Sequence, residues 1–143
     1  MNIKRLILAV VAVFIGVWAT NFLIHGVWLK SDYAASMTLW RPEAEMGKHF
    51  LPLLGGQFLA SLMFVLIWAH ADIKTLPRAC AFGLCMGLAK ESTTLILYAV
   101  QPFPGELAAK WFIAGVIQAT LMGIVVFFTY GSNTRTQPAA AAP

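Results

Sequence analysis

The sequence predicts an all-α fold, an integral membrane four-helix bundle in up-down-up-down order. The 143-residue chain is 59% hydrophobic and only 11% of its residues are charged, whereas an average soluble domain carries about 25% charged residues. Its apolar residues form four long runs rather than short alternating ones. The connections after the second and third runs are short, and short connections join antiparallel neighbours.

Each apolar run suits one transmembrane helix, which needs roughly 20 residues at about 1.5 Å of rise each. Pro77 begins the third run and the prolines of residues 102–104 end it, because proline disrupts a helix from within. The helices are expected at about residues 6–29, 50–69, 79–100 and 111–130 of a bundle that spans 1–130. Residues 131–143 hold an alanine run and two prolines and are expected to form a disordered cytoplasmic tail.

Lysine and arginine set the predicted orientation of the bundle. Five fall on the side of the two termini, namely Lys4, Arg5, Lys74, Arg78 and Arg135, and four fall on the other, namely Lys30, Arg41, Lys48 and Lys110. The side with more basic residues near its helix ends faces the cytoplasm, so both termini are predicted there. The net charge of +4 is scattered over short loops. It favours anionic lipid headgroups of the bilayer over a nucleic-acid partner.

Two neighbouring charges, Lys90 and Glu91, lie near the middle of the third run. Placing either one at the bilayer centre costs at least about 2.5–3.5 kcal/mol on insertion scales, so something must compensate for it. Glu91 shares a helical face with Gly83 and Gly87 and is expected to point into the bundle. Lys90 lies about 100° away around the helix. Three roles stay open for it: pairing with an inward carboxylate, contact with a partner protein, or snorkelling.

The other runs carry polar residues at similar depths. Counted from the non-cytoplasmic helix ends, these residues lie between about 6 Å and about 15 Å below the surface. The predicted intramembrane polar site comprises Asn21, His25, Gln57, Lys90, Glu91, Thr94 and Gln118. For the amides and Thr94, ordinary hydrogen bonding between helices is the favoured interpretation. For Glu91, a functional site and a structural ion pair are both open.

Small residues predict where two helices approach closely. They form one stripe on the third run and another on the fourth, and they are Gly83, Gly87, Gly115, Ala119 and Gly123. Such stripes let backbones come together in membranes. The two cysteines, Cys80 and Cys85, are five residues apart on one predicted helix. They point in different directions, so a disulfide between them is not expected.

The linker over residues 30–49 is predicted to be either an ordered amphipathic surface element or a plain loop with aromatic anchors. Tyr33, Met37 and Trp40 recur there at helical spacing, with Arg41 and Glu43 beside them. Tryptophan and arginine are common anchors of protein interfaces. These five residues are therefore the predicted partner-docking loop, and the alternative for Trp40 is a membrane-interface belt.

Motifs for catalysis and metal binding are missing from the sequence. It has no Gly-x-Ser-x-Gly, no phosphate loop, no His-Glu-x-x-His and no metal-ligand spacing. No metal site and no cofactor are predicted, and enzymatic activity is not expected. A membrane enzyme acting on lipid or quinone would have only His25, Lys90 and Glu91 as acid–base groups.

Several short stretches resemble a group of uncharacterised small bacterial four-helix inner-membrane proteins. The most specific part is Trp40-Arg41-Pro42-Glu43, within Leu-Trp-Arg-Pro-Glu-Ala-Glu-Met. The other parts are His25-Gly26, Tyr33, Gly56-Gln57, residues 82–84, Tyr98, residues 102–104 and Trp111. The resemblance implies a bacterial inner membrane. It carries no activity, ligand or catalytic residue.

Two functions remain open after these observations. The first is an accessory or structural subunit that packs against a larger membrane complex, favoured by the small size, the glycine stripes and the absence of catalytic motifs. The alternative is an oligomeric small-solute or proton-linked transporter or channel that uses the polar layer around Glu91. Partners are therefore the bilayer and other membrane subunits or further copies of the chain. The sequence names no activity, solute, partner complex or oligomeric state.

Overall fold

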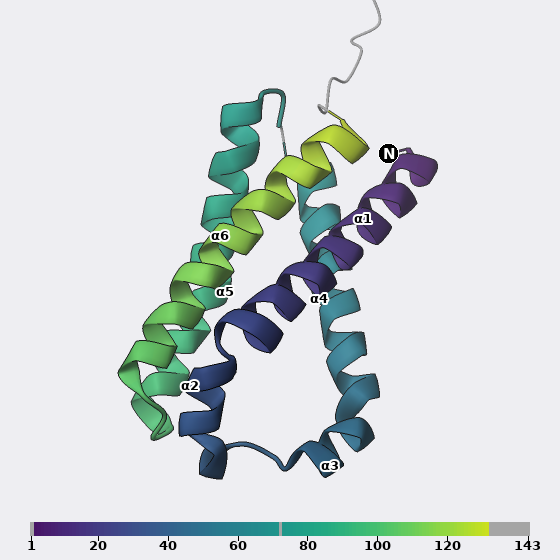
Figure 1. Ribbon diagram of the computed structural model, residues 1–143. Coiled ribbons are helices and arrows are strands. Elements are labelled where there is room, and N and C mark those ends of the chain that lie inside the picture. The colour runs from purple at the N-terminus through teal and green to yellow at the C-terminus, as the bar shows by residue number, and fades with distance from the viewer. Residues whose placement is uncertain (1, 72, 132–143) are drawn as a thin grey trace, which may run out of the picture.

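The computed structural model describes residues 2–71 and 73–131, and every regular element in this part of the chain is a helix (Figure 1). Four helices are long, namely α1 (Ile3–Asn21), α4 (Phe50–His70), α5 (Leu76–Val100) and α6 (Gly105–Tyr130). Between α1 and α4 run a π-helix, η1 (Phe22–Trp28), then α2 (Lys30–Ala35), η2 (Met37–Leu39), α3 (Glu43–Met46) and η3 (Gly47–His49).

Four stretches of the described chain are long and apolar enough to cross a membrane by length and composition. They are Ile3–Trp28, Met37–His70, Leu76–Val100 and Gly105–Tyr130. The prediction of four long apolar helices in an all-helical chain is therefore confirmed for the described residues.

Local chemistry explains where the long helices begin. The side chain of Asn2 caps α1 by accepting the Arg5 backbone N–H at 3.2 Å, which satisfies one of the free donors of the first turn. Pro77 stands in the first turn of α5, where its missing N–H has no cost. Helix α5 thus begins at Leu76, three residues before the predicted start at residue 79.

Helix α6 begins at Gly105, six residues before the predicted start at residue 111. The prediction placed the helix start where the apolar run begins, whereas residues 105–110 are mostly good helix formers that follow Pro104. Glu106 in the first turn also suits the positive end of the helix dipole. Apolar length therefore underestimated the true length of this helix.

A single helix was predicted for residues 6–29, but the first apolar run is not one regular α-helix. The α-helical part ends at Asn21, and a π-helix continues to Trp28. The Leu29 N–H donates to the Ile24 carbonyl at 2.8 Å, five residues back, which is the hydrogen-bond spacing of a π-helix. Because a π-helix has a wider turn than an α-helix, His25 is not directly above Asn21, as it would be at the i,i+4 position of an α-helix.

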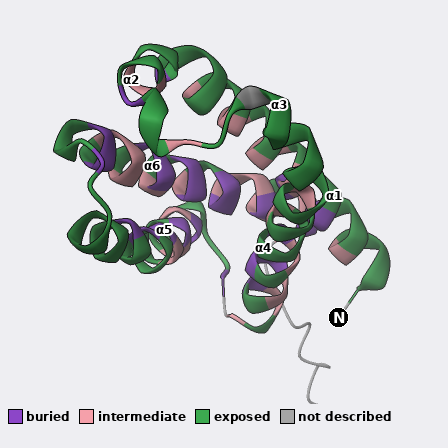
Figure 2. Ribbon diagram, turned by 90° about the horizontal axis from the view of Figure 1, so that it is seen from below, coloured by how far each residue is buried: buried purple, intermediate pink, exposed green. Residues whose placement is uncertain are grey.

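Helix α6 lies between α1 and α5 and carries much of the buried surface (Figure 2). Helices α5 and α6 form an antiparallel hairpin, because Gly83 meets Ala119 while Gly123 meets Ala79. A β-carbon at Gly83 or Gly123 would collide with the facing backbone, so the small-residue stripes allow this close approach. Helix α4 packs against α1 and diverges from α5 (Figure 1).

The apolar core gathers in the half of the molecule that holds the two described chain ends. Trp68 and Val65 of α4 are fully buried there with Val126 of α6. Trp68 and Phe64 both contact the Phe82 ring edge-to-face, with centroids 5.2 Å apart in each pair. The other half, toward α2 and the turn between α5 and α6, holds the polar residues.

The linker over residues 30–49 is built of short helices. This agrees with the ordered alternative. Helices α2 and α3 lie at the end of the molecule opposite the N-terminus (Figure 1). The predicted tail begins with Gly131, whose φ of 88° ends α6. The rest of the tail lies outside the described residues.

Candidate functional site

A cleft of about 420 Å³ opens between α1, η1, α5 and α6. Polar side chains from all four elements line it, together with apolar atoms of α6 and η1. The lining residues are Asn21, Ile24, His25, Lys90, Glu91, Thr93, Thr94, Trp111, Ala114, Gly115 and Gln118. Helix α4 contributes none of them.

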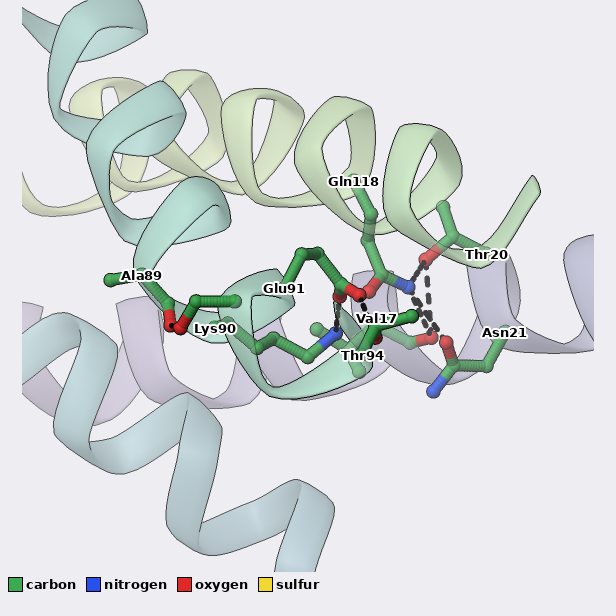
Figure 3. A network of polar contacts seen from close by, with 9 residues as sticks. Val17, Thr20, Asn21, Ala89, Lys90, Glu91, Thr94 and Gln118 are labelled. Atoms are coloured by element: carbon green, nitrogen blue, oxygen red, sulfur yellow. Dashed lines mark hydrogen bonds and ion pairs between the residues drawn. The ribbon is translucent and has the colours of Figure 1, made fainter. Parts of the chain in front are cut away.

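The Glu91 carboxylate is buried against α6, with 5% of the residue exposed. Its Oε1 accepts a hydrogen bond from Lys90 Nζ at 2.9 Å, and its Oε2 accepts one from the Thr94 hydroxyl at 2.6 Å (Figure 3). Gly115 provides the space, because a β-carbon there would overlap the Glu91 carboxyl group. The carboxylate is therefore fixed by its own helix on two sides and by the bare backbone of α6 on the third.

Lys90 differs sharply from its partner in exposure. Its side chain is 61% exposed, against 6% for that of Glu91. An ammonium group has three N–H donors, and in the described residues the contact to Glu91 is the hydrogen bond that it makes. Two donors of Lys90 therefore remain for whatever occupies the cleft.

Gln118 joins α6 to α1 through its amide nitrogen. Nε2 donates to the Thr20 hydroxyl at 2.6 Å and to Asn21 Oδ1 at 2.8 Å. The Thr20 hydroxyl donates its proton to the Gly16 carbonyl at 2.7 Å, so in its contact with Gln118 it is the acceptor. This fixes Asn21 Oδ1 as an acceptor and leaves the Asn21 amide N–H groups unused, turned away from Gln118 (Figure 3).

A chain of three polar groups leads from the cleft to α2. His25 Nδ1 lies 2.5 Å from the Tyr33 hydroxyl, and Trp111 Nε1 donates to that same hydroxyl at 2.8 Å. The Tyr33 hydroxyl accepts from Trp111 and shares a second hydrogen bond with His25 Nδ1. When the hydroxyl donates this bond, the imidazole carries its other proton on Nε2. Burial raises the pKa of Tyr33 above its usual value. The hydrogen bond from Trp111 lowers this pKa, and the nearby charge of Asp32 raises it.

An aromatic cluster covers this end of the cleft. The Trp111 ring lies 5.7 Å from Trp40, 6.2 Å from Tyr33 and 5.1 Å from Phe103, measured between centroids. Asp32 of α2 accepts from Lys110 of α6 at 2.6 Å beside it. This pair and the aromatic rings hold α2 against the start of α6.

Six of the seven predicted polar residues meet in the cleft, and Gln57 does not. The six are Asn21, His25, Lys90, Glu91, Thr94 and Gln118. Gln57 lies on α4, which diverges from α5, and its buried Oε1 has no hydrogen-bond partner among the described residues. Polar residues of all four helices were predicted at similar depths, but depth alone does not decide which helices are neighbours.

The structure also bears on a role that the sequence left open and adds residues that it missed. Of the three roles open for Lys90, the structure contains the pairing with an inward carboxylate, that of Glu91. Of the residues predicted to dock a partner, Tyr33 and Trp40 pack on Trp111, while Met37 is 71% exposed and Arg41 is also exposed, and the docking role itself stays a prediction. The side chain of Glu43 lies outside the described part. The roles of Trp111, Thr20 and Thr93 were missed, since no local pattern links them to residues of another helix.

Comparisons with protein-family models, curated proteins and solved structures found no match. The resemblance to small bacterial inner-membrane proteins stays a prediction. Among the described residues, no group of three or more His, Cys, Asp or Glu side chains is placed to hold a metal ion, and Cys80 and Cys85 are free thiols.

Proposed function

We propose that this chain is a multi-pass protein of the bacterial inner membrane, with both termini in the cytoplasm and four spans in up-down-up-down order, and that its cleft binds a small polar solute within the membrane. The observation that carries the proposal is the ion pair of Lys90 and Glu91. Both residues line a polar cleft, and the Lys90 side chain is exposed there. Ionisable groups inside a membrane most often face water-filled cavities and mark solute or proton paths.

The exposure of Lys90 supports this interpretation. A side chain that is 61% exposed near the middle of a span would face lipid or water. Lipid is costly for an ammonium group, by at least about 2.5–3.5 kcal/mol, whereas the cleft offers polar neighbours on α1 and η1. A hydrated cleft therefore accounts for the position of Lys90 at the lowest cost. Since four helices are few for a complete solute path, we propose a homo-oligomer for transport.

Water access to the cleft tests the proposal. Thr93 lines the cleft on α5, and Ile113 lies at a similar level on α6 but outside the cleft, with 56% exposure. In a Cys80→Ala/Cys85→Ala background reconstituted in liposomes, Thr93→Cys should react with water-soluble methanethiosulfonate reagents about tenfold or more faster than Ile113→Cys, because thiolates form in water and not in lipid. Equal, slow reaction of both cysteines would remove the hydrated cleft from the proposal.

A second candidate is the accessory subunit of a larger membrane complex, and the position of α4 favours it. Helix α4 packs mainly on α1, contacts α5 near its own C-terminal end through Phe82, and exposes Leu51, Leu53 and Leu59. Its Gln57 oxygen is buried without a hydrogen-bond partner in the described chain. A partner helix seated on α4 would cover these exposed leucines. Gentle detergent extraction from native membranes tests this, and a protein that always runs alone at its monomer mass contradicts it.

A further inference from the structure

Three residues that line the cleft have hydrogen-bond donors without an acceptor among the described residues. In this part of the chain Lys90 Nζ has two unused N–H groups, and the Asn21 amide nitrogen is unused, since its oxygen accepts from Gln118. His25 presents Nε2–H when its Nδ1 accepts the Tyr33 proton. All three residues line the same cleft.

The charged acceptor of the cleft, the Glu91 carboxylate, is by contrast already engaged, which leaves uncharged acceptors such as Gln118 Oε1. The Glu91 oxygens accept from Lys90 and Thr94. The acid has no exposed face for a cation to approach, because Gly115 packs directly on the carboxyl group and only 5% of Glu91 is exposed. Unused donors around a cation recognise an acceptor-rich, negatively charged group.

We infer that the cleft binds the oxyanion group of its solute, a carboxylate, phosphate or sulfate, on Lys90, Asn21 and His25, and that one proton enters with it. This inference rests on the proposed function and names the chemistry of its ligand. The anion could belong to a free solute or to a lipid headgroup, since both present the same oxygens to the donors.

The proton follows from the position of Glu91. The carboxylate lies 2.9 Å from Lys90 Nζ, so an anion on the other donors of Lys90 would meet a second negative charge nearby. Protonation of Glu91 removes that repulsion and frees the full charge of Lys90 for the anion. The other charged or titratable group in the described cleft is His25 of η1, while the parts of α1 and α6 that line it contribute neutral side chains. Anion and proton thus bind together, and the proton offsets one negative charge of the anion.

Sulfate is a suitable probe, because its charge stays the same between mildly acidic and mildly alkaline pH. With the full chain in phosphatidylcholine nanodiscs, calorimetric titration should show sulfate affinity rising as the pH falls, by up to about tenfold per pH unit for one coupled proton. Glu91→Gln should bind sulfate about tenfold or more tightly than the wild type at mildly alkaline pH, and without pH dependence. His25→Gln should bind more weakly but keep the slope.

Matched variants separate binding from folding. Lys90→Met/Glu91→Gln removes both charges while keeping similar volumes, so it avoids an unmatched buried carboxylate and should lose sulfate binding. Lys110→Met removes a cation that pairs with Asp32 outside the cleft and should leave sulfate affinity unchanged. Nanodiscs that contain phosphatidic acid provide the lipid arm. Retention of that lipid by the wild type but not by the double variant, with no sulfate binding, assigns the anion to a headgroup.

Three results would overturn the inference. The first is the absence of both sulfate and phosphatidic acid binding in the wild type and in Glu91→Gln. The second is sulfate binding that survives in Lys90→Met/Glu91→Gln. The third is a pH slope that persists in Glu91→Gln and vanishes in His25→Gln. Each is distinct from failure of the proposed function, because Thr93→Cys would still report a hydrated cleft if only the ligand chemistry is wrong.

Discussion

Gly115 determines where the Glu91 carboxyl group lies, because the α6 backbone leaves just enough room for it. Most glycines in long helices lower stability, so one facing a buried acid has a packing role. The end of a glutamate side chain can often swing aside, but here both oxygens are held by Lys90 and Thr94. Any added atom at residue 115 must therefore break these contacts or separate the helices.

Gly115→Ala should lower the free energy of unfolding by about 1–3 kcal/mol, the usual cost of overpacking. The matched control is Gly55→Ala on α4, where a β-carbon meets nothing within 4 Å and helix propensity predicts a gain of about 0.5–1 kcal/mol. Steric-trap unfolding in bicelles measures both. Equal effects of the two substitutions would show that Glu91 does not pack against residue 115.

The two members of the ion pair should differ in what their loss costs. Lys90→Met leaves the almost fully buried Glu91 carboxyl without its cation, and should destabilise by roughly 3 kcal/mol. Glu91→Gln leaves an ammonium group that is 61% exposed, and should cost under about 1 kcal/mol. The same unfolding assay at neutral pH compares them. A larger loss in Glu91→Gln than in Lys90→Met would contradict the observed burial.

Tyr33 should make stability fall at high pH. Its pKa is raised in the folded protein, chiefly by burial, so the unfolded chain loses the phenolic proton first as the pH passes about 10. The folded state is then the one that holds more protons, and stability decreases with further rise in pH. Tyr33→Phe should flatten this part of the curve. Tyr98→Phe, at an exposed tyrosine, serves as the control for removing a phenol elsewhere.

At the scale of elements, α2 is held to α6 by one ion pair and by the aromatic cluster. The carboxylate of Asp32 lies 2.6 Å from Lys110 Nζ, and the two side chains are 20% and 34% exposed. A salt bridge that is this exposed to solvent contributes little to global stability, about 1 kcal/mol or less. It fixes the position of a short helix that has no buried residue.

Asp32→Asn should therefore change the free energy of unfolding by less than about 1 kcal/mol while speeding hydrogen exchange in α2 several-fold, since local opening needs less energy than global unfolding. Mass-spectrometric hydrogen exchange of peptides covering residues 30–35 measures this. Glu45→Gln, an exposed acid in α3, is the control. Unchanged exchange in Asp32→Asn would assign the position of α2 to the aromatic rings alone.

The sequence was informative about elements and weak about their ends. Apolar length located four long helices, because burial in lipid or protein requires long apolar runs. It missed the π-helix of η1, since no residue pattern over Phe22–Trp28 distinguishes the two hydrogen-bond spacings. It also placed the start of α6 at Trp111, where the polar first turn gives way to apolar residues.

For the whole molecule, the level of a residue along the bundle was predictable, whereas helix adjacency was predictable only for α5 and α6, from their small-residue stripes. Counting residues along each run placed Asn21, Glu91 and Gln118 at one level, and they do share a cleft. The same count included Gln57, although α4 diverges from α5. Which helices are neighbours depends on the close contacts of Gly83 and Gly123 across α5 and α6, and these contacts lie between residues far apart in the chain.

The proposed topology places the turn before α5 in the cytoplasm and the α2–α3 segment on the opposite side. The basic residues near the termini and the turn favour that orientation. Thr75 and Thr38 are exposed at the two ends of the molecule. In a Cys80→Ala/Cys85→Ala background, Thr38→Cys should react with a membrane-impermeant maleimide in intact spheroplasts, whereas Thr75→Cys should react only after the membrane is permeabilised. The reverse pattern would invert the orientation, and labelling of both positions in intact spheroplasts would contradict the alternating order of the spans.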